Sequence, residues 1–161
     1  MPEQRPQLLE CGIRDVVFGT GVKLVQPTNL YGCQIGDDCF IGPFVEIQKE
    51  VSIGARTRIQ SHSFVCELVS IGEDCFVGHG VMFINDTFAT GGPARGRKAL
   101  WRSTRIGNRV SIGSNATILP VEICDDVVIG AGAVVTRSIT QPGCYVGNPA
   151  RLLERNEDKA R

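Results

Sequence analysis

The sequence has no excess of either charge, because 17 Lys and Arg residues balance 17 Asp and Glu residues. This balance gives no electrostatic case for nucleic acid or an acidic membrane surface as a partner. No stretch approaches the ~18 consecutive apolar residues that suggest a membrane span, and no basic-plus-apolar leader opens the chain. We therefore expect no nucleic-acid partner and no membrane insertion.

Paired cysteine motifs are also missing. The seven cysteines are scattered, odd in number, and contain no CxxC pair. This usage favours reduced thiols packed as small apolar side chains over a disulfide framework, and it predicts a cytoplasmic protein. The chain is 161 residues long, which fits a single domain (1–161) with enough aliphatic content for a sizeable core.

What the sequence does contain is a six-residue repeat, which matches neither a helix nor a strand period. Small or β-branched residues follow the repeated position four residues later, and Gly directly follows it in several repeats. After an interruption the rhythm resumes and then loses one residue. The repeated positions are Ile35, Ile41, Ile47, Ile53, Ile59, Val65, Ile71, Val77 and Phe83, then Ile106, Ile112 and Ile118, then Ile123, Ile129 and Val135.

Three such hexads make one triangular coil of about 18 residues, in which each hexad supplies a short strand and a corner. Residues one coil apart then stack at the parallel-strand spacing of roughly 4.8 Å. We expect Ile35, Ile53 and Ile71 to form one inward ladder, with two similar ladders beside it. The sequence therefore predicts an all-β fold, a parallel β-helix of about five triangular coils.

The chain divides into parts by how well it follows this rhythm. The Gly-rich start predicts an irregular first coil or cap, and the polar, Gly-rich interruption predicts a projecting loop, which in a solenoid is usually functional. A Pro followed by Leu-Leu-Glu-Arg predicts a short C-terminal helix. The expected parts are 1–34 (cap), 35–83 (regular coils), 84–105 (loop), 106–140 (coils) and 141–161 (tail).

Several segments together resemble the hexapeptide-repeat acyltransferases, and most of all the group that N-acetylates nucleotide-linked amino sugars. They are the block that ends in the Asn-Asp pair at 85–86, followed by IGSNATIL, IGAGAVVTRSI and GNPAR. The resemblance covers roughly residues 20–153. It implies left-handed coils, a homotrimer with active sites between subunits, acetyl-CoA as co-substrate, and a role in surface-polysaccharide (O-antigen or lipopolysaccharide) biosynthesis.

The resemblance gives Asn85 and Asp86 candidate catalytic roles, since similar acetyltransferases carry an Asn-Asp pair here with the Asn near the acetyl carbonyl or sulfur. A side-chain amide can donate a hydrogen bond to the oxyanion that forms at the thioester carbon, or to the departing thiolate. The alternative is a simple turn, because Asn-Asp is common where a strand ends.

Glu67 is the candidate group for the acceptor amine. It lies two positions after Val65, as Asn85 lies two positions after Phe83, so we expect Glu67 and Asn85 to stack on one outward face. Relatives often have an acidic residue here in a Trp-Asp-Gly or Tyr-Asp-Gly context, whereas this chain has Cys-Glu-Leu. A carboxylate here can hold the sugar's ammonium, accept its proton, or both. The alternative is a solvated charge paired with Lys49.

Histidine is scarce, with only His62 and His79. His62 is a candidate for lining the sugar pocket, whereas His79 should stack over Ser61 and Pro43. A neighbouring branch of the fold uses a loop His to deprotonate a hydroxyl, and residues 84–105 contain none. That absence disfavours an O-acetyltransferase, which is the nearest rival enzyme, and a non-catalytic assembly scaffold is the rival of another class. The zinc enzymes of this fold need three His, so we expect no metal.

The predicted CoA groove comes from the second block. Exposed backbone groups beside small side chains can bond to the amides of a pantetheine arm, and Arg side chains can meet phosphates. Tight coil packing is the alternative for the small residues, and plain surface charge for the Arg residues. The candidates are Ser114, Asn115, Ala116, Gly130, Ala131, Ala133, Arg137 and Arg151.

Two further clusters carry expectations. Basic and aromatic side chains gather in the loop, where either a nucleotide diphosphate or a neighbouring subunit's acidic flank would suit them. Aromatic residues at outward positions are too numerous for a lone prism, so we expect a cyclic trimer. The loop cluster is Arg95, Arg97, Lys98, Trp101, Arg102 and Arg105, and the outward aromatics are Phe40, Phe44, Phe64 and Phe76.

Overall fold

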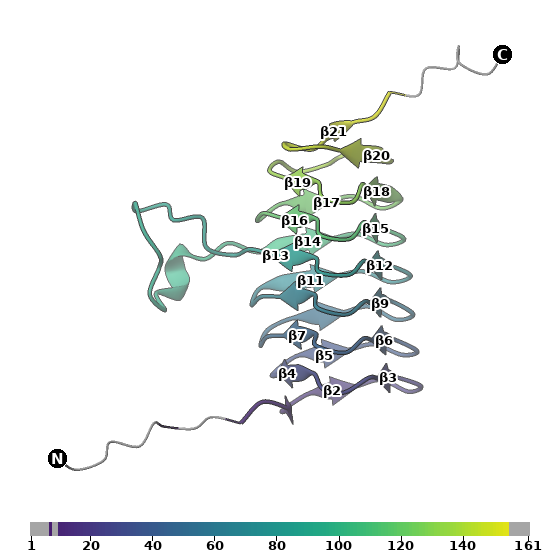
Figure 1. Ribbon diagram of the computed structural model, residues 1–161, viewed down its shortest axis with the longest axis vertical. Coiled ribbons are helices and arrows are strands. Elements are labelled where there is room, and N and C mark those ends of the chain that lie inside the picture. Colours follow the sequence, from purple (N-terminus) through teal and green to yellow (C-terminus); the bar gives the residue numbers. More distant parts are fainter. Residues whose placement is uncertain (1–6, 8–9, 155–161) are drawn as a thin grey trace.

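The chain forms a triangular prism in which short strands stack into three parallel sheets along one long axis (Figure 1). The computed structural model describes Gln7 and residues 10–154. Sheet A has seven strands: β1 (Ile13–Arg14), β4 (Asn29–Tyr31), β7 (Glu46–Ile47), β10 (Phe64–Val65), β13 (Met82–Phe83), β16 (Thr117–Ile118) and β19 (Val134–Val135).

The other two sheets complete each turn. Sheet B has six strands: β2 (Val17–Phe18), β5 (Gln34–Ile35), β8 (Ser52–Ile53), β11 (Val69–Ile71), β14 (Thr104–Ile106) and β17 (Glu122–Ile123). Sheet C has eight: β3 (Lys23–Leu24), β6 (Phe40–Ile41), β9 (Arg58–Ile59), β12 (Phe76–Val77), β15 (Ser111–Ile112), β18 (Val127–Ile129), β20 (Gly143–Val146) and β21 (Arg151–Leu152). The predicted all-β, left-handed parallel β-helix is confirmed.

The inward ladders form the core. Ile35 pairs with Ile53, which pairs in turn with Ile71, and all three are at most 4% exposed. Each such burial stabilises the fold by about 1.5–3 kcal/mol, so the repeated aliphatic positions supply most of the hydrophobic stabilisation. Corners stack as tightly as strands, because a Cβ added to Gly54 would lie 2.5 Å from the backbone carbon of Gly72.

The two ends of the chain differ from the prediction. Residues 13–31 are a regular rung and not an irregular cap, since Phe18 pairs with Ile35 and Leu24 with Ile41. A five-residue step from Leu30 to Ile35 hid this rung, so the predicted count of about five coils was too low. In the described part of the tail, β21 pairs antiparallel with β20 where a helix was expected. Residues 155–161 lie outside the described part.

The insertion loop, residues 84–103, leaves the prism between β13 and β14 and projects sideways, as predicted (Figure 1). It contains one short 3-10 helix, η1 (Lys98–Leu100). Across the loop Val69 pairs with Thr104, 35 positions apart, whereas Ser52 pairs with Ser70, 18 apart. The loop therefore adds 17 residues to one turn and leaves the sheet register intact.

All seven cysteines are free thiols, and Cys33, Cys39, Cys66 and Cys75 are buried. Burial raises the pKa of the Cys33 thiol to about 11 and that of the Cys66 thiol to about 12. These thiols therefore stay protonated and act as small apolar side chains, as the sequence predicts.

Candidate active site

The site is built on the corner that joins sheet A to sheet B, here called the A–B corner. Lys49, Glu67 and Asn85 occupy equivalent places on three successive turns, as the repeat predicts. The Lys49 ammonium lies 3.7 Å from Glu67 Oε1, and Asn85 Nδ2 donates a 3.2 Å hydrogen bond to the Glu67 carbonyl oxygen. The solenoid therefore holds a carboxylate and a carboxamide one above the other.

Glu67 lies beside Lys49, as its alternative role expects, but it is not solvated, since only 7% of the residue is exposed. A second ammonium comes from the insertion loop, where Lys98 Nζ lies 2.7 Å from Glu67 Oε2. The same ammonium donates a 3.0 Å hydrogen bond to Glu50 Oε1, one turn below. Contacts with Glu67 first and Glu50 second raise the pKa of Lys98 to about 12. Lys98 thus ties the loop to the A–B corner.

A hollow of about 390 Å³ lies between this corner and the insertion loop. Its polar lining residues are Gln48, Glu67, Asn85 and Asp86, and the rest of its wall is aromatic or apolar. Gln48 Oε1 accepts a 3.3 Å hydrogen bond from the Glu67 N–H. The lining, which we call the corner hollow, consists of Gln48, Phe64, Cys66, Glu67, Phe83, Ile84, Asn85, Asp86, Phe88 and Trp101.

Asp86 has a clear task inside the loop. Its Oδ1 accepts a 3.0 Å hydrogen bond from the Phe88 N–H, and its Oδ2 accepts a 2.6 Å hydrogen bond from the Ala94 N–H. Because both oxygens accept hydrogen bonds from backbone N–H groups, this carboxylate stabilises the loop conformation, which agrees with the alternative role of Asp86 as a turn residue. It still borders the corner hollow through its place in the wall.

The two histidines lie at the opposite edge of sheet A, on the corner that joins sheet C to sheet A (the C–A corner). His62 is exposed and stacks on Phe44, with ring centroids 4.8 Å apart. His79 Nδ1 lies 2.8 Å from Ser61 Oγ, which agrees with the predicted stacking. Neither ring borders the corner hollow, so a single chain does not bring His62 to Glu67.

The predicted CoA residues divide into two groups. Ser114 and Asn115 lie on the C–A corner above His79, and Gly130 and Ala131 follow one turn later with backbone at or near the surface. Asn115 adopts a left-handed φ of 59°, and its Oδ1 lies where a Cβ on Gly80 would come within 2.5 Å. These residues present backbone and short side chains along one edge of the prism.

Ala116 and Ala133 do not offer such a surface. Both are fully buried, and their N–H groups are bonded to Gly113 and Gly130. Their carbonyl oxygens accept hydrogen bonds from Met82 and Thr117, on the preceding strands of sheet A, so these two alanines serve coil packing, which was their alternative role.

The two predicted phosphate ligands are both exposed. Arg137 is exposed on the turn after β19, and Arg151 is exposed on β21, where its Nη1 donates to the Ala150 carbonyl at 2.9 Å.

Within the described residues, no group of three or more His, Cys, Asp or Glu side chains is placed to hold a metal ion. No helix in the described part is long and apolar enough to cross a membrane.

Comparison with known families identifies the class of protein. The model for the bacterial transferase hexapeptide (six repeats) matches residues 32–67, and that for the hexapeptide repeat of succinyl-transferase matches residues 68–82 and 103–137. These segments coincide with the rungs on both sides of the insertion loop. The chain belongs to the hexapeptide-repeat transferase family.

Curated relatives include the bifunctional protein GlmU of Trichodesmium erythraeum, 29% identical over 145 residues. That alignment covers 89% of this chain and 28% of the relative. The GlmU of Clostridium acetobutylicum is 30% identical over 154 residues, covering 88% of this chain and 32% of the relative. The chain thus spans about a third or less of the length of these relatives.

Solved structures with the same fold include a hexapeptide transferase family protein from Anaplasma phagocytophilum, with a TM-score of 0.70 at 16% identity, covering 88% of this chain and 81% of that one. A mutant perosamine N-acetyltransferase from Caulobacter crescentus, in complex with CoA and GDP-perosamine, gives a TM-score of 0.61 at 20% identity and covers 87% and 54%. A Vibrio cholerae hexapeptide-repeat acetyltransferase in complex with acetyl-CoA gives 0.60 at 20% and covers 84% and 70%.

Proposed function

We propose that the chain is an acetyl-CoA-dependent N-acetyltransferase that acts on a nucleotide-linked amino sugar in O-antigen or lipopolysaccharide biosynthesis. One observation carries the proposal: Glu67, which is largely buried, and Asn85 both line the same aromatic-walled hollow. An amino sugar has an apolar ring face for aromatic walls and an amine for a carboxylate. The Caulobacter and Vibrio proteins with this fold, crystallised with CoA or acetyl-CoA, support the choice of co-substrate.

The reaction we propose is direct attack. The neutral amine forms a bond to the thioester carbonyl carbon, and the carbonyl oxygen becomes an oxyanion. Collapse of this intermediate breaks the carbon–sulfur bond, and the amine proton leaves to Glu67 or to the departing CoA thiolate. Part of an amino sugar's amine is neutral at pH 7, so Glu67 serves chiefly to orient it.

Asn85 is suited to the oxyanion. Its side-chain amide has two N–H groups, and one of them donates to the Glu67 carbonyl. That bond fixes the direction of the second N–H, which is then preorganised toward charge that develops on the carbonyl oxygen.

We further propose that the working unit is a homotrimer with the active site between subunits. The corner hollow and the C–A corner lie at opposite edges of sheet A, so in one chain the proposed acceptor and CoA surfaces are apart. Among the outward aromatics, Phe44 is 57% and Phe76 is 41% exposed, whereas Phe40 and Phe64 are half-buried. A neighbouring prism would cover the exposed rings and join the two surfaces in one groove.

A turnover assay tests the proposal. The purified chain is incubated with acetyl-CoA and a panel of nucleotide-linked amino sugars, and release of the CoA thiol is followed with a thiol reagent. We expect thiol release that depends on an acceptor amine and is absent with the matching hydroxyl sugars. Acetylation of the hydroxyl sugars would favour an O-acetyltransferase, and failure to bind CoA would favour a scaffold.

A further inference from the structure

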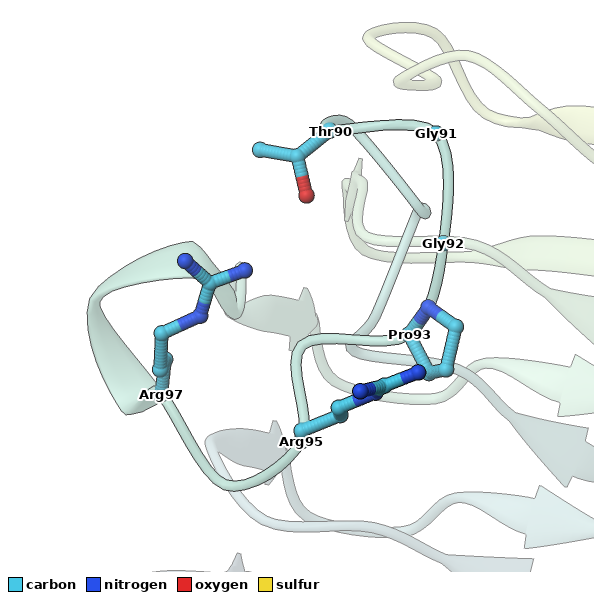
Figure 2. A pocket seen from close by; sticks show the side chains of 6 residues that line it. All are labelled: Thr90, Gly91, Gly92, Pro93, Arg95 and Arg97. Carbon is cyan, nitrogen blue, oxygen red and sulfur yellow. The ribbon is translucent and has the colours of Figure 1, made fainter.

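A second hollow, of about 460 Å³, lies within the insertion loop itself. Figure 2 shows it as a curved stretch of backbone with two arginine side chains beside it. Its lining is basic and small, and quite unlike that of the corner hollow. We call it the loop hollow, and it is lined by Thr90, Gly91, Gly92, Pro93, Arg95 and Arg97.

Positive charge predominates around the loop hollow, and the nearby carboxylate of Asp86 has both oxygens bonded to backbone N–H groups of the loop. Residues 87–105 contain five Arg and Lys side chains and no Asp or Glu, in a chain whose net charge is zero. Lys98 is neutralised by Glu50 and Glu67, but among the described residues neither Arg95 nor Arg97 has an acidic partner. Two uncompensated guanidinium groups therefore border the same hollow, which favours an anion.

Two of the donors, from Arg97 and Thr90, face one another across the hollow (Figure 2). Arg97 Nε donates a 3.2 Å hydrogen bond to the Ala94 carbonyl, which fixes the plane of its guanidinium. Figure 2 shows the ends of the Arg97 and Thr90 side chains turned toward one another across the hollow, with Arg95 beneath Pro93. Gly91 has φ +82° and no atom within 4 Å of an added Cβ, so the backbone here is open to a ligand. A fixed fork, a second guanidinium and a hydroxyl suit an anion with several oxygens, such as a diphosphate.

The loop hollow also adjoins the corner hollow. Asp86 borders the corner hollow, and its Oδ2 accepts a 2.6 Å hydrogen bond from Ala94, which lies in sequence between two residues of the loop hollow. Phe88, in the corner hollow, is likewise two residues from Thr90. In a nucleotide-linked sugar the diphosphate is attached directly to the sugar ring, so its two binding surfaces must also adjoin.

We propose that the loop hollow binds the diphosphate of the nucleotide-linked acceptor, with Arg95 and Arg97 as its ligands. This inference rests on the proposed function and specifies which part of the chain holds the acceptor's phosphates. CoA also contains a diphosphate, so the experiment must separate the two sources.

Isothermal titration of the full chain does so, with inorganic pyrophosphate, the nucleoside diphosphates dTDP, UDP and GDP, and CoA as separate probes. Arg97→Gln and Arg95→Gln remove the proposed ligands. Arg102→Gln is the matched control, because Arg102 lies in the same loop but lines a different hollow. We expect Arg97→Gln to raise the Kd of pyrophosphate and of the preferred nucleoside diphosphate about tenfold, with the CoA Kd unchanged.

Several outcomes would overturn the assignment. Equal weakening by Arg102→Gln would mean diffuse charge and not a site. Loss of CoA affinity in Arg97→Gln, with nucleoside diphosphate affinity kept, would assign the hollow to CoA. Wild-type protein that binds CoA and acetylates an amino sugar, but binds no nucleoside diphosphate, would overturn this inference and leave the proposed function standing. If diphosphate binding depends on Arg97 but the protein has no transferase activity, the loop hollow remains a diphosphate site and the proposed function is overturned.

Discussion

Glu67 is buried and lies beside two ammonium groups, those of Lys49 and Lys98. In the proposed reaction it either orients the acceptor amine or takes its proton. Glu67→Gln keeps the shape of the side chain and removes its charge. If the carboxylate orients the amine, the KM of the acceptor should rise roughly tenfold or more, because the amine's hydrogen bond to a charged carboxylate is lost. The rate should recover toward pH 9 as the amine deprotonates itself, and steady-state kinetics from pH 6 to 9 measure both effects.

Glu50→Gln is the matched control for this substitution, since Glu50 also contacts Lys98 but does not border the corner hollow. A turnover loss of roughly 10²–10⁴ in Glu67→Gln that persists at pH 9 would instead make Glu67 the general base. His62→Asn is the second test, because His62 lies on the C–A corner, which the proposed trimer would bring beside the corner hollow of a neighbouring subunit; an equal turnover loss in His62→Asn would make His62 the base, and no loss would leave Glu67 as the candidate.

Asn85 is expected to act on the transition state. Asn85→Ala should lower kcat by around 10²–10³, the usual cost of removing one oxyanion donor. The Kd of CoA should change little, since the lost interaction develops only as the carbonyl becomes charged. Stopped-flow turnover together with CoA titration checks both halves, and full activity in this variant would return Asn85 to the role of a turn residue.

At the scale of the element, the insertion loop is held by a charge contact that no repeat predicts. Lys98→Met should release the loop from Glu67 and Glu50, so trypsin should cleave after Arg95 and Arg97 faster than in the wild type. The pKa of Lys98 is raised to about 12 from its usual 10.5, so its contribution is complete below 10.5 and is lost as the pH rises through about 12. Protection from cleavage should therefore be constant from pH 7 to 9; a fall within that range would contradict the ion pair as the cause.

The loop also shows which structural features the sequence predicts and which it does not. The start of the loop and the stacking of Lys49, Glu67 and Asn85 were predictable, because both follow from a strict period along the chain. The expected end at 105 ran two residues into β14, which begins at Thr104. The contact between Lys98 and Glu67 was not, since a loop outside the repeat carries no rule for where its side chains return. The missed first rung has a different cause. Phe18, Leu24 and Leu30 follow the ladders, but the five-residue step to Ile35 shifts the phase that a six-residue search requires.

For the molecule as a whole, the corner that joins sheet B to sheet C carries stacked ion pairs. Arg56 contacts Glu73 and Asp74, and Arg109 contacts Asp125 and Asp126. Hydrogen bonds from Arg56 lower the pKa of Asp74, and those from Arg109 lower the pKa of Asp126.

Arg56→Gln should therefore lower the Tm slightly at pH 7, and the difference from the wild type should disappear in acid. A depressed carboxyl pKa contributes stability above its unfolded value, near 3.8, that is lost as the pH falls through the folded value. Melting curves at pH 7 and pH 2.5 in low salt measure this, and a difference that stays constant would show that Arg56 acts by packing and not by charge.

Assembly is the second prediction at this scale. Sedimentation of the chain at micromolar concentration should give a trimer, because exposed rings such as Phe44 and Phe76 need a covering surface. Phe76→Glu on an outward strand should shift the equilibrium toward monomer and reduce turnover with it. A monomer with full activity would refute the shared groove.

Because the register continues unbroken across the insertion loop, the loop and the prism can change in sequence independently of one another. Phe64 pairs with Met82, and Met82 with Thr117, as if the 17 added residues were not there. Mutations that alter Thr90–Arg97 can therefore accumulate without disturbing the ladders on which folding depends. Selection for a new acceptor can act on the loop while the prism is maintained separately, so the two parts of the chain are free to evolve at different rates.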